Sequence, residues 1–429
     1  MSKLLRRTRH PSDTLAYSVE WGKQRTTRTK SRSFFGRSAP DDQQHVRTRL
    51  GACQQETTLA WFSLLVRTRF FAPLKSRSAQ NDAREIMRQG RYTFGPMRKL
   101  VFHLLLPCAI CFGLVPASLH AQALLVVNQG DTNVSVVDPA AAKEVATIAE
   151  KTTGVHGHEV AVSADGHTAF VPIYGSSGVG KPGIDGHEML VIDLPSREIV
   201  GDIDFGHGVR PHCAVLDRTS GLLYVTTELD KTVTIVDPNT KKILGAVPTG
   251  QEESHMLALS HDGKRGYTAN VGPGTVSVLD MPGRKTVAVI PVSGQVQRIA
   301  ISADDKLVFT SDQTKPQLAV IDTATQKVKT WVALPGTGYG TAATPDGRWL
   351  LVAVPSTNQV AVVDLGSMQV VRRVDVPNMP QEILIRPDGK IAYVSCAASG
   401  KVAAIDLAEW NVQKVITAGK FADGLGWAK

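Results

Sequence analysis

Short apolar stretches that alternate with polar positions recur along the chain from about residue 122 to its C-terminus. The clearest is an apolar strand that ends in aspartate, and its last four intervals are about 42 to 43 residues long. Seven aspartates close these strands: Asp138, Asp193, Asp237, Asp280, Asp322, Asp364 and Asp406. Several short strands per unit at this period are typical of the blades of a β-propeller.

Each unit predicts four strands in the same order. An inner strand comes first, and in several units an Asp-Gly turn follows, because this pair supplies the positive φ that a tight hairpin needs. A second strand and then the strand ending in aspartate come next. The aspartate closes an Asx-turn into the last strand, as in Asp237-Pro238-Asn239. The recurring aspartates are therefore interpreted as turn formers and not as seven catalytic acids.

The two ends of the repeat region are incomplete in complementary ways. The first unit, residues 124–148, lacks an inner strand, whereas residues 423–428 have the inner-strand pattern and nothing after it. Pairing of the two would close the ring and protect strand edges. The sequence therefore predicts an all-β protein: a seven-bladed β-propeller over residues 122–429, closed by pairing the C-terminal strand with the N-terminal blade.

The second strand of several units carries a further motif, followed each time by an apolar strand ending in aspartate. Its copies are Tyr224-Val225-Thr226-Thr227, Tyr267-Thr268-Ala269-Asn270 and Tyr393-Val394-Ser395-Cys396. The repeat resembles the YVTN-repeat (YncE-like) family of secreted bacterial β-propellers over essentially all of residues 122–429. The resemblance implies the fold but no single function, because that family includes binding proteins and scaffolds, and it leaves binding of single-stranded DNA open.

The positive charge of the chain lies outside the repeat region. The whole chain has a net charge of +9 and a pI near 9.3. Residues 1–96 carry about 19 Lys and Arg against about 7 Asp and Glu, whereas residues 122–429 carry about 27 against about 32. The propeller is thus mildly acidic, and a nucleic-acid partner is not favoured for it.

Residues 97–121 have the three parts of a secretory signal peptide. Met97-Arg98-Lys99 is basic, residues 100–115 are apolar, and small residues precede a cleavage site after Ala121 or Ala123. The apolar run of about 16 residues is short for a membrane span. We therefore expect a periplasmic or secreted bacterial protein with no membrane span in the mature chain. Residues 1–96 are interpreted as an over-extended N-terminus, with a disordered basic segment as the alternative.

Histidine is confined to one part of the repeat region. All eight histidines of residues 122–429 lie between His156 and His261, in blades 2 to 4. Alignment of the inner strands places three of them at the same position of successive blades: His158, His212 and His255. The equivalent residues of the other blades are Gln297, Tyr339, Gln381 and Asp423.

Three imidazoles around one channel mouth suit copper or zinc with an open coordination position. His158, His212 and His255 are the predicted ligands, with His156 and Glu159 as further ones. Cys213 and Met256 would be softer accessory ligands that favour copper. The alternative is a set of surface histidines hydrogen-bonded to loop carbonyls. Cys213 and Cys396 fall in blades 3 and 7 and are expected to be free, partly buried thiols.

The longest departure from the repeat is an insertion in blade 2, residues 174–187. Its place between the second and third strands puts it over the same mouth, so we interpret it as a lid loop. Its Gly-rich run lacks the Walker spacing and does not open a helix, which argues against nucleotide binding. The predicted contacts for a polar or anionic ligand are Lys181 and His187 of this loop, together with Arg298, Tyr339, Gln381 and Glu382.

Residues 122–429 contain no serine-hydrolase elbow, haem-attachment Cys-x-x-Cys-His, paired-cysteine zinc motif or dinucleotide fingerprint. The absence of these motifs favours a non-enzymatic role. The first hypothesis is a periplasmic binding or scaffold protein whose His-lined funnel receives a small ligand or a periplasmic protein partner. One alternative is a copper or zinc metalloprotein used in metal handling or in redox or hydrolytic catalysis. A lactonase-like hydrolase is a further one.

Overall fold

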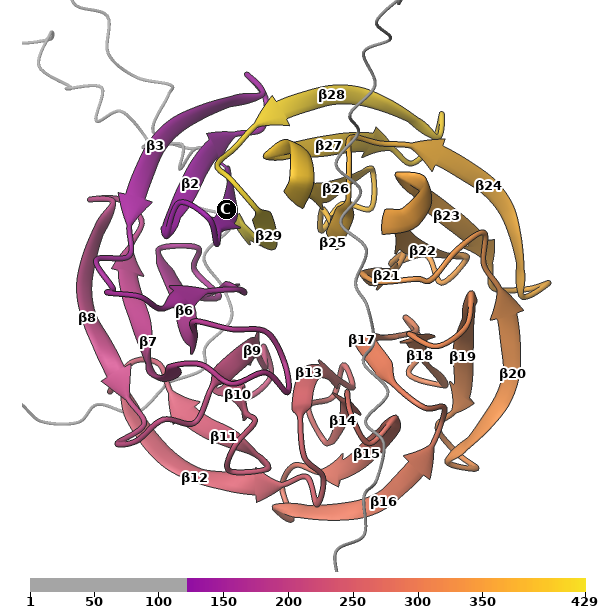
Figure 1. Cartoon of the computed structure of the whole chain (residues 1–429), viewed down its shortest axis with the longest axis horizontal. Coiled ribbons are helices and arrows are strands. Elements are labelled where there is room, and N and C mark those ends of the chain that lie inside the picture. The colour runs from indigo at the N-terminus through magenta and orange to yellow at the C-terminus, as the bar shows by residue number, and fades with distance from the viewer. Residues whose placement is uncertain (1–121) are drawn as a thin grey trace, which may run out of the picture. The chain divides into compact units, whose positions relative to one another are not determined.

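The computed structural model describes residues 122–429, so the interpretations of residues 1–96 and 97–121 lie outside the described part. Seven antiparallel sheets are arranged around a central axis, and the first and last strands of the described chain lie side by side (Figure 1). The predicted seven-bladed β-propeller is confirmed. Among residues 122–429 there is no helix long and apolar enough to cross a membrane.

Each blade contributes one inner strand next to the axis, and in blade 2 this strand is split in two. In blade order from blade 1, the inner strands are β29 (Ala422–Ala428), β4 (His156–Gly157) with β5 (Ala161–Val162), β9 (Pro211–Leu216), β13 (Ser254–Leu259), β17 (Val296–Ile301), β21 (Thr341–Ala343) and β25 (Pro380–Ile385). The second strands are β1 (Ala123–Asn128), β6 (Thr168–Gly175), β10 (Leu223–Thr227), β14 (Arg265–Asn270), β18 (Leu307–Asp312), β22 (Trp349–Val354) and β26 (Ile391–Cys396).

The third strands are those that end in the recurring aspartate: β2 (Asn133–Asp138), β7 (Asp185–Asp193), β11 (Thr232–Asp237), β15 (Thr275–Asp280), β19 (Gln317–Asp322), β23 (Gln359–Asp364) and β27 (Lys401–Asp406). The outer strands are β3 (Lys143–Ala149), β8 (Glu198–Asp204), β12 (Lys242–Pro248), β16 (Lys285–Pro291), β20 (Lys327–Ala333), β24 (Gln369–Asp375) and β28 (Asn411–Thr417). Two 3-10 turns, η1 (Pro355–Thr357) and η2 (Ala397–Ser399), follow second strands.

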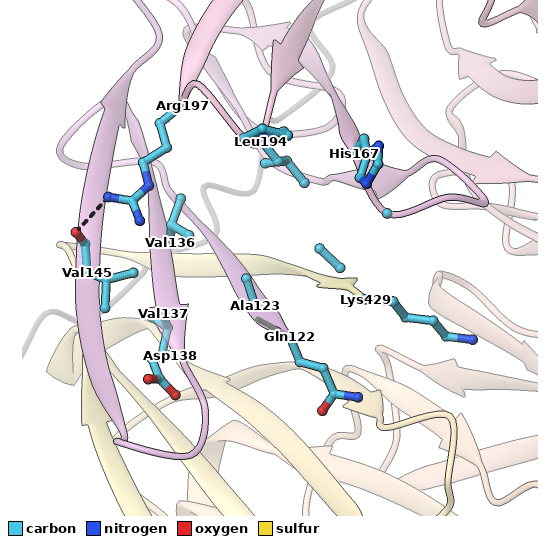
Figure 2. Close-up of a pocket in the computed structure, with 13 residues that line it drawn as sticks. Gln122, Ala123, Val136, Val137, Asp138, Val145, His167, Leu194, Arg197 and Lys429 are labelled. Carbon is cyan, nitrogen blue, oxygen red and sulfur yellow. Dashed lines mark hydrogen bonds between the residues drawn. The ribbon is translucent and has the colours of Figure 1, made fainter. Parts of the chain in front are cut away.

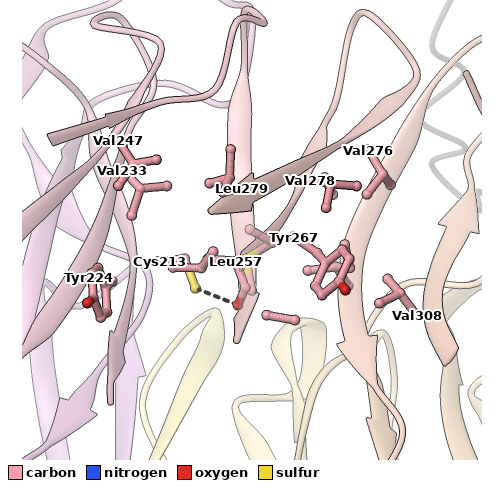
Figure 3. Packing of buried hydrophobic residues seen from close by; sticks show 14 of the residues in the cluster. Cys213, Tyr224, Val233, Val247, Leu257, Tyr267, Val276, Val278, Leu279 and Val308 are labelled. Atoms are coloured by element: carbon pink, nitrogen blue, oxygen red, sulfur yellow. Dashed lines mark hydrogen bonds between the residues drawn. The ribbon is translucent and has the colours of Figure 1, made fainter. Parts of the chain in front are cut away.

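The place of a strand within its blade explains its hydrophobic pattern. Second and third strands such as β22 and β23 are buried at nearly every position, because both faces of each sheet pack against the neighbouring sheets. Outer strands such as β16 alternate between exposed and half-buried positions. Figure 3 shows a core that continues from blade 3 to blade 5, with Tyr224, Leu257 and Val308 in one cluster.

The recurring aspartates form the predicted turns. The Oδ1 atoms of Asp138, Asp237 and Asp406 each accept a hydrogen bond from the backbone N–H two residues later, at 2.8, 3.0 and 2.7 Å. Cys213 and Cys396 are free and buried, and burial raises the pKa of each thiol to about 12. Both thiols are therefore protonated and unreactive at neutral pH.

Closure follows the predicted scheme, because β29 pairs with β1 from Ala123↔Ala428 to Asn128↔Ala422. Trp427 of β29 stacks on Tyr393 of blade 7, with ring centroids 5.7 Å apart. On the other side, the Gly424 N–H donates to the carbonyl of His158 in blade 2 at 2.8 Å. The last strand therefore joins blades 7, 1 and 2.

A hollow of about 300 Å³ lies between blades 1 and 2, next to both ends of the described chain (Figure 2). Its lining includes Gln122, Lys429 and His167, and Arg197 spans its edge by donating to the carbonyl of Val145 at 3.3 Å. None of the predicted site residues lines this hollow.

Candidate ligand-binding cavity

A cavity of about 270 Å³ lies on the axis, at the end of the ring where the chain enters the inner strands. The seven residues that the inner-strand alignment made equivalent, here called the ring residues, all line it: His158, His212, His255, Gln297, Tyr339, Gln381 and Asp423. Further lining residues come from neighbouring loops: Gln129, Gly178, Val179, Val271, Gln295 and Gln313, with Arg298 after the ring residue of blade 5.

Bulges in the inner strands direct these side chains toward the axis. The pairing register shifts between Ser254 and Met256 in blade 4, and between Gln297 and Ile299 in blade 5. Blades 1, 3 and 7 have the same irregularity next to their ring residues. In blade 5 the bulge residue Arg298 has φ +52°, a conformation that is uncommon for a residue with a Cβ. Bulges that re-aim side chains are frequent beside functional sites.

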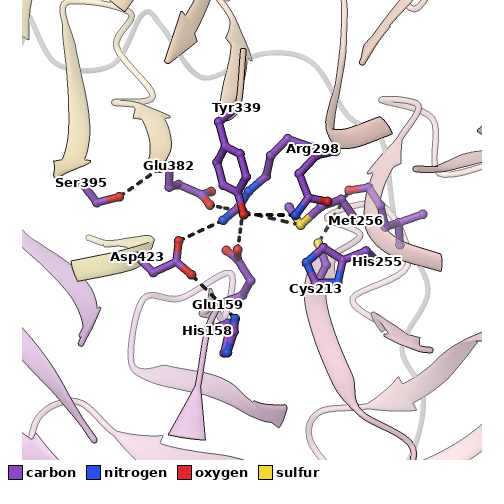
Figure 4. Close-up of polar contacts among 12 residues, drawn as sticks. His158, Glu159, Cys213, His255, Met256, Arg298, Tyr339, Glu382, Ser395 and Asp423 are labelled. Carbon is purple, nitrogen blue, oxygen red and sulfur yellow. Dashed lines mark hydrogen bonds and ion pairs between the residues drawn. The ribbon is translucent and has the colours of Figure 1, made fainter. Parts of the chain in front are cut away.

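Arg298 is the centre of a buried ion cluster that includes the ring residue Asp423 (Figure 4). Its Nη1 atom bonds Glu159 and, at 2.6 Å, Glu382, while its Nη2 atom bonds Asp423 at 2.9 Å. The Arg298 guanidinium also lies 5.2 Å from the ring centre of Tyr339. Only 3% of Arg298 is exposed, so a single buried cation is shared by three carboxyl groups. If all were ionised, the cluster would carry a formal charge of −2.

The carboxylates of this cluster resist ionisation. Burial raises the pKa of Glu159 well above its ordinary value and also raises the pKa of Glu382 and Asp423, while Arg298 opposes the rise in each. The sequence had suggested Glu159 as a metal ligand and Arg298 as a contact for an anion. Both side chains are instead bonded to each other, and each Nη atom of Arg298 already binds a carboxylate, whereas its buried Nε has no partner among the described residues.

The three aligned histidines come together as the alignment predicted. The rings of His212 and His255 have centroids 3.5 Å apart, and those of His158 and His212 are 5.2 Å apart. His156 stacks on His158 with centroids 4.9 Å apart. Burial lowers the pKa of His158 and His212 well below the ordinary value, so both imidazoles are neutral at pH 7.

Their arrangement is not that of the predicted copper or zinc centre. Residues 122–429 include no group of three or more His, Cys, Asp or Glu side chains that could hold a metal ion. The rings of His212 and His255 lie against each other, and His255 Nδ1 is bonded to Glu228. The accessory ligands are engaged elsewhere: Cys213 contacts the carbonyl of Leu257. Met256 contacts Arg298.

Tyr174 and Glu228 organise the histidines, and the sequence pattern had given neither this role. The Tyr174 hydroxyl donates to Glu228 at 2.8 Å, and Glu228 bonds His255. The Tyr174 ring also contacts His158, His212 and His255, with centroids 4.8 to 5.8 Å apart. Tyr174 begins the insertion, so its place at the lid was visible in the sequence, whereas its contact with blades 3 and 4 was not.

The insertion covers the cavity, since Gly178 and Val179 belong to its lining. Buried Arg210 of blade 3 holds the loop: its Nε donates to Asp185 at 2.5 Å and its Nη2 to the carbonyl of Lys181 at 2.8 Å. Neither Lys181 nor His187 lines the cavity, in contrast to the prediction. The His187 side chain is 55% exposed and bonds Asp204 at 3.2 Å.

Of the other predicted ligand contacts, Tyr339 and Gln381 line the cavity, whereas Glu382 lies behind the lining, bonded to Arg298. Three glutamines that line the cavity were not among the predicted contacts: Gln129, Gln295 and Gln313. Only their place in the repeat could have indicated them, because they lie in the loops that enter inner strands or join second to third strands. In the sequence nothing sets these glutamines apart from surface residues.

A buried carboxyl lies beside the site without a charge partner. Burial raises the pKa of Glu150 to about 7, and its Oε2 accepts from the Gly157 N–H at 3.1 Å while Oε1 has no partner. A raised pKa makes the folded state more stable below pH 4.5 and less stable as the pH rises to about 7. Glu150→Gln is therefore expected to raise the free energy of unfolding by up to about 3 kcal/mol at pH 8.

The same Glu150→Gln change should have almost no effect at pH 4.5. Urea denaturation of both proteins at the two pH values tests this. Exposed Glu409→Gln is the control, with less than about 0.5 kcal/mol expected at either pH. An equal effect of Glu150→Gln at both pH values would contradict the assignment.

One family model matches part of the chain, and a solved structure is similar in fold. The family model described as the cytochrome D1 heme domain matches residues 218–343, which is less than half of the chain. No curated protein matches the chain. Among solved structures, "Kuenenia stuttgartiensis Hydrazine Synthase" is similar with a TM-score of 0.58 and 20% identity over 67% of this chain and 92% of that chain. At this identity the likeness shows the propeller fold alone.

The cavity does not fit the haem that the matched family's name implies. An imidazole nitrogen without a partner, as His158 and His212 have, suits an axial ligand. A planar macrocycle also needs an apolar slot, but Val179 and Val271 are the only aliphatic lining residues in the described chain. The two anionic propionates of a haem would also need cations, and Arg298, the one arginine or lysine in the described lining, is already paired with three carboxylates.

Proposed function

We propose that this protein is a periplasmic binding propeller of the YVTN-repeat type, whose axial cavity takes a small polar ligand beneath the lid loop 174–187. The observation that carries the proposal is that all seven ring residues line one cavity, although they come from seven blades. A volume of about 270 Å³ is close to the lower end of the roughly 300–1,000 Å³ found for small-molecule sites.

Buried polar atoms without partners support a ligand in this cavity. Gln297 Oε1, His158 Nε2 and His212 Nδ1 have no hydrogen-bond partner among the described residues. Buried polar groups in folded proteins nearly always have one, because an unsatisfied group costs about 1–3 kcal/mol. A bound molecule would satisfy them. The signal-peptide pattern of residues 97–121 supports the periplasmic part of the proposal.

Thermal unfolding with a set of small polar compounds, covering cations, anions and neutral molecules, tests the binding function. A compound at one hundred times its Kd should stabilise the protein by about 2.7 kcal/mol. Gln297→Leu is expected to abolish most of this shift, since Gln297 lines the cavity. Gln413→Leu, on the exposed outer strand β28, should leave it unchanged. Shifts that are absent for every class, or equal in both variants, would exclude the axial cavity as the binding site.

A further inference from the structure

The charges around the cavity narrow the class of ligand. Arg298 is the only cation in its lining among the described residues, and its Nη atoms bond Glu159, Glu382 and Asp423. Burial keeps His158 and His212 neutral, so these two imidazoles add no countercharge. An anion entering the cavity would therefore meet the carboxyl group of Asp423 and, in the described lining, no cation that is free of carboxylate partners.

One unpartnered group of the cavity, the Gln297 side-chain oxygen, is an acceptor that requires a hydrogen-bond donor from the ligand. Gln297 is 8% exposed, and its Nε2 already donates to the Tyr339 hydroxyl at 3.1 Å, which leaves its Oε1 as an acceptor without a donor. His212 is 1% exposed, and its Nδ1 is also unpartnered. An ammonium group carries three donors and no acceptor. It would satisfy the Gln297 Oε1 acceptor and form an ion pair with Asp423, the one carboxyl group in the described lining.

We propose that the ligand is a small aliphatic amine, bound as its ammonium ion between Gln297, the histidine side of the ring and the Asp423 carboxylate. This inference rests on the proposed function and specifies its ligand. The lid residues Gly178 and Val179 restrict the cavity, so a short chain is expected rather than a large polyamine.

Three compounds of the same length separate the ligand classes: 1,4-diaminobutane, 1,4-butanediol and succinate. In calorimetric titrations of the full chain at pH 7.5, the diamine is expected to bind at least tenfold more tightly than the diol, and succinate is expected not to bind. The affinity of the diamine should fall on going from 25 to 150 mM NaCl, because its attraction to the carboxylates is partly screened.

Two pairs of variants locate the site. Gln297→Leu is expected to weaken diamine binding about tenfold or more, and Glu382→Gln several-fold, whereas the exposed controls Gln413→Leu and Glu409→Gln should have no effect. Binding of the diol or succinate that depends on Gln297 would overturn the amine proposal and leave the binding function standing. A preference for CaCl₂ or CuCl₂ over the diamine would also overturn it. Failure of every compound class in the thermal test would remove the binding function itself.

Discussion

The variant Arg298→Met is expected to lose about 3–5 kcal/mol of its free energy of unfolding at pH 8. Arg298 is the single cation for Glu159, Glu382 and Asp423, and all four side chains are buried or nearly so. Methionine fills much of the same volume but leaves three carboxyl groups without a countercharge. Removing one partner of a buried ion pair is strongly destabilising for this reason, although the intact pair contributes little net stability.

The loss should depend on pH in a definite direction. Burial already raises the pKa of the three carboxyl groups, and without Arg298 their pKa values rise further. Groups with a raised folded-state pKa favour the folded state at low pH, and this contribution disappears as the pH increases through that pKa. The difference between wild type and Arg298→Met is therefore expected to be smaller at pH 5 than at pH 8.

Urea denaturation at the two pH values measures both effects. Arg348→Met is the matched control: Arg348 lies over the ring of Trp349 at 4.4 Å, and its loss should cost about 0.5–1 kcal/mol at either pH. Adding Glu159→Gln and Asp423→Asn to Arg298→Met should recover part of the stability, because two of the three unpaired charges are then absent. A loss below 1 kcal/mol at pH 8, or one that does not change with pH, would show that Arg298 does not hold the carboxylates in place.

Removal of residues 422–429 is expected to prevent cooperative folding. This deletion takes away β29, the whole inner strand of blade 1, and exposes the edge of β1. It also removes the Trp427–Tyr393 stack with blade 7 and the Gly424 hydrogen bond to blade 2. The losses together are comparable with the roughly 5–15 kcal/mol by which a domain is stable. Circular dichroism during thermal unfolding, with limited proteolysis, provides the measurement.

A single substitution tests the closure of the ring without removing β29. A Cβ atom at Gly424 would lie 2.3 Å from the carbonyl oxygen of His158, so Gly424→Ala should force β29 away from blade 2 and lower stability by about 1–3 kcal/mol. A Cβ at Gly178 would meet nothing within 4 Å, so Gly178→Ala is the matched control and should be neutral. A truncated protein that still unfolds cooperatively within a few degrees of wild type would contradict the closure argument.

The alignment of the inner strands predicted part of the site. It placed His158, His212 and His255 at equivalent positions, and their rings do meet around the axis. It did not reveal that residues directly after ring positions also meet, such as Arg298 of blade 5, which bonds Glu159 of blade 2 and Glu382 of blade 7. Contacts between blades 2 and 5 cross the channel, and no local pattern encodes a distance across it.

The sequence by itself determined the fold of residues 122–429, because the period-2 alternation, the Asp-Gly turns and the recurring aspartates act within one blade of about forty residues. Closure of the ring could also be predicted from the sequence. The incomplete first blade and the single last strand can satisfy each other's backbone hydrogen-bonding groups only by pairing. Tertiary structure alone decided the chemistry of the axis. The inner-strand bulges set where each side chain points, and burial of three carboxylates around one arginine turned a predicted anion contact into a neutralised cation. The partners of these groups come from different blades, so the electrostatics of the cavity exist only once the ring is closed.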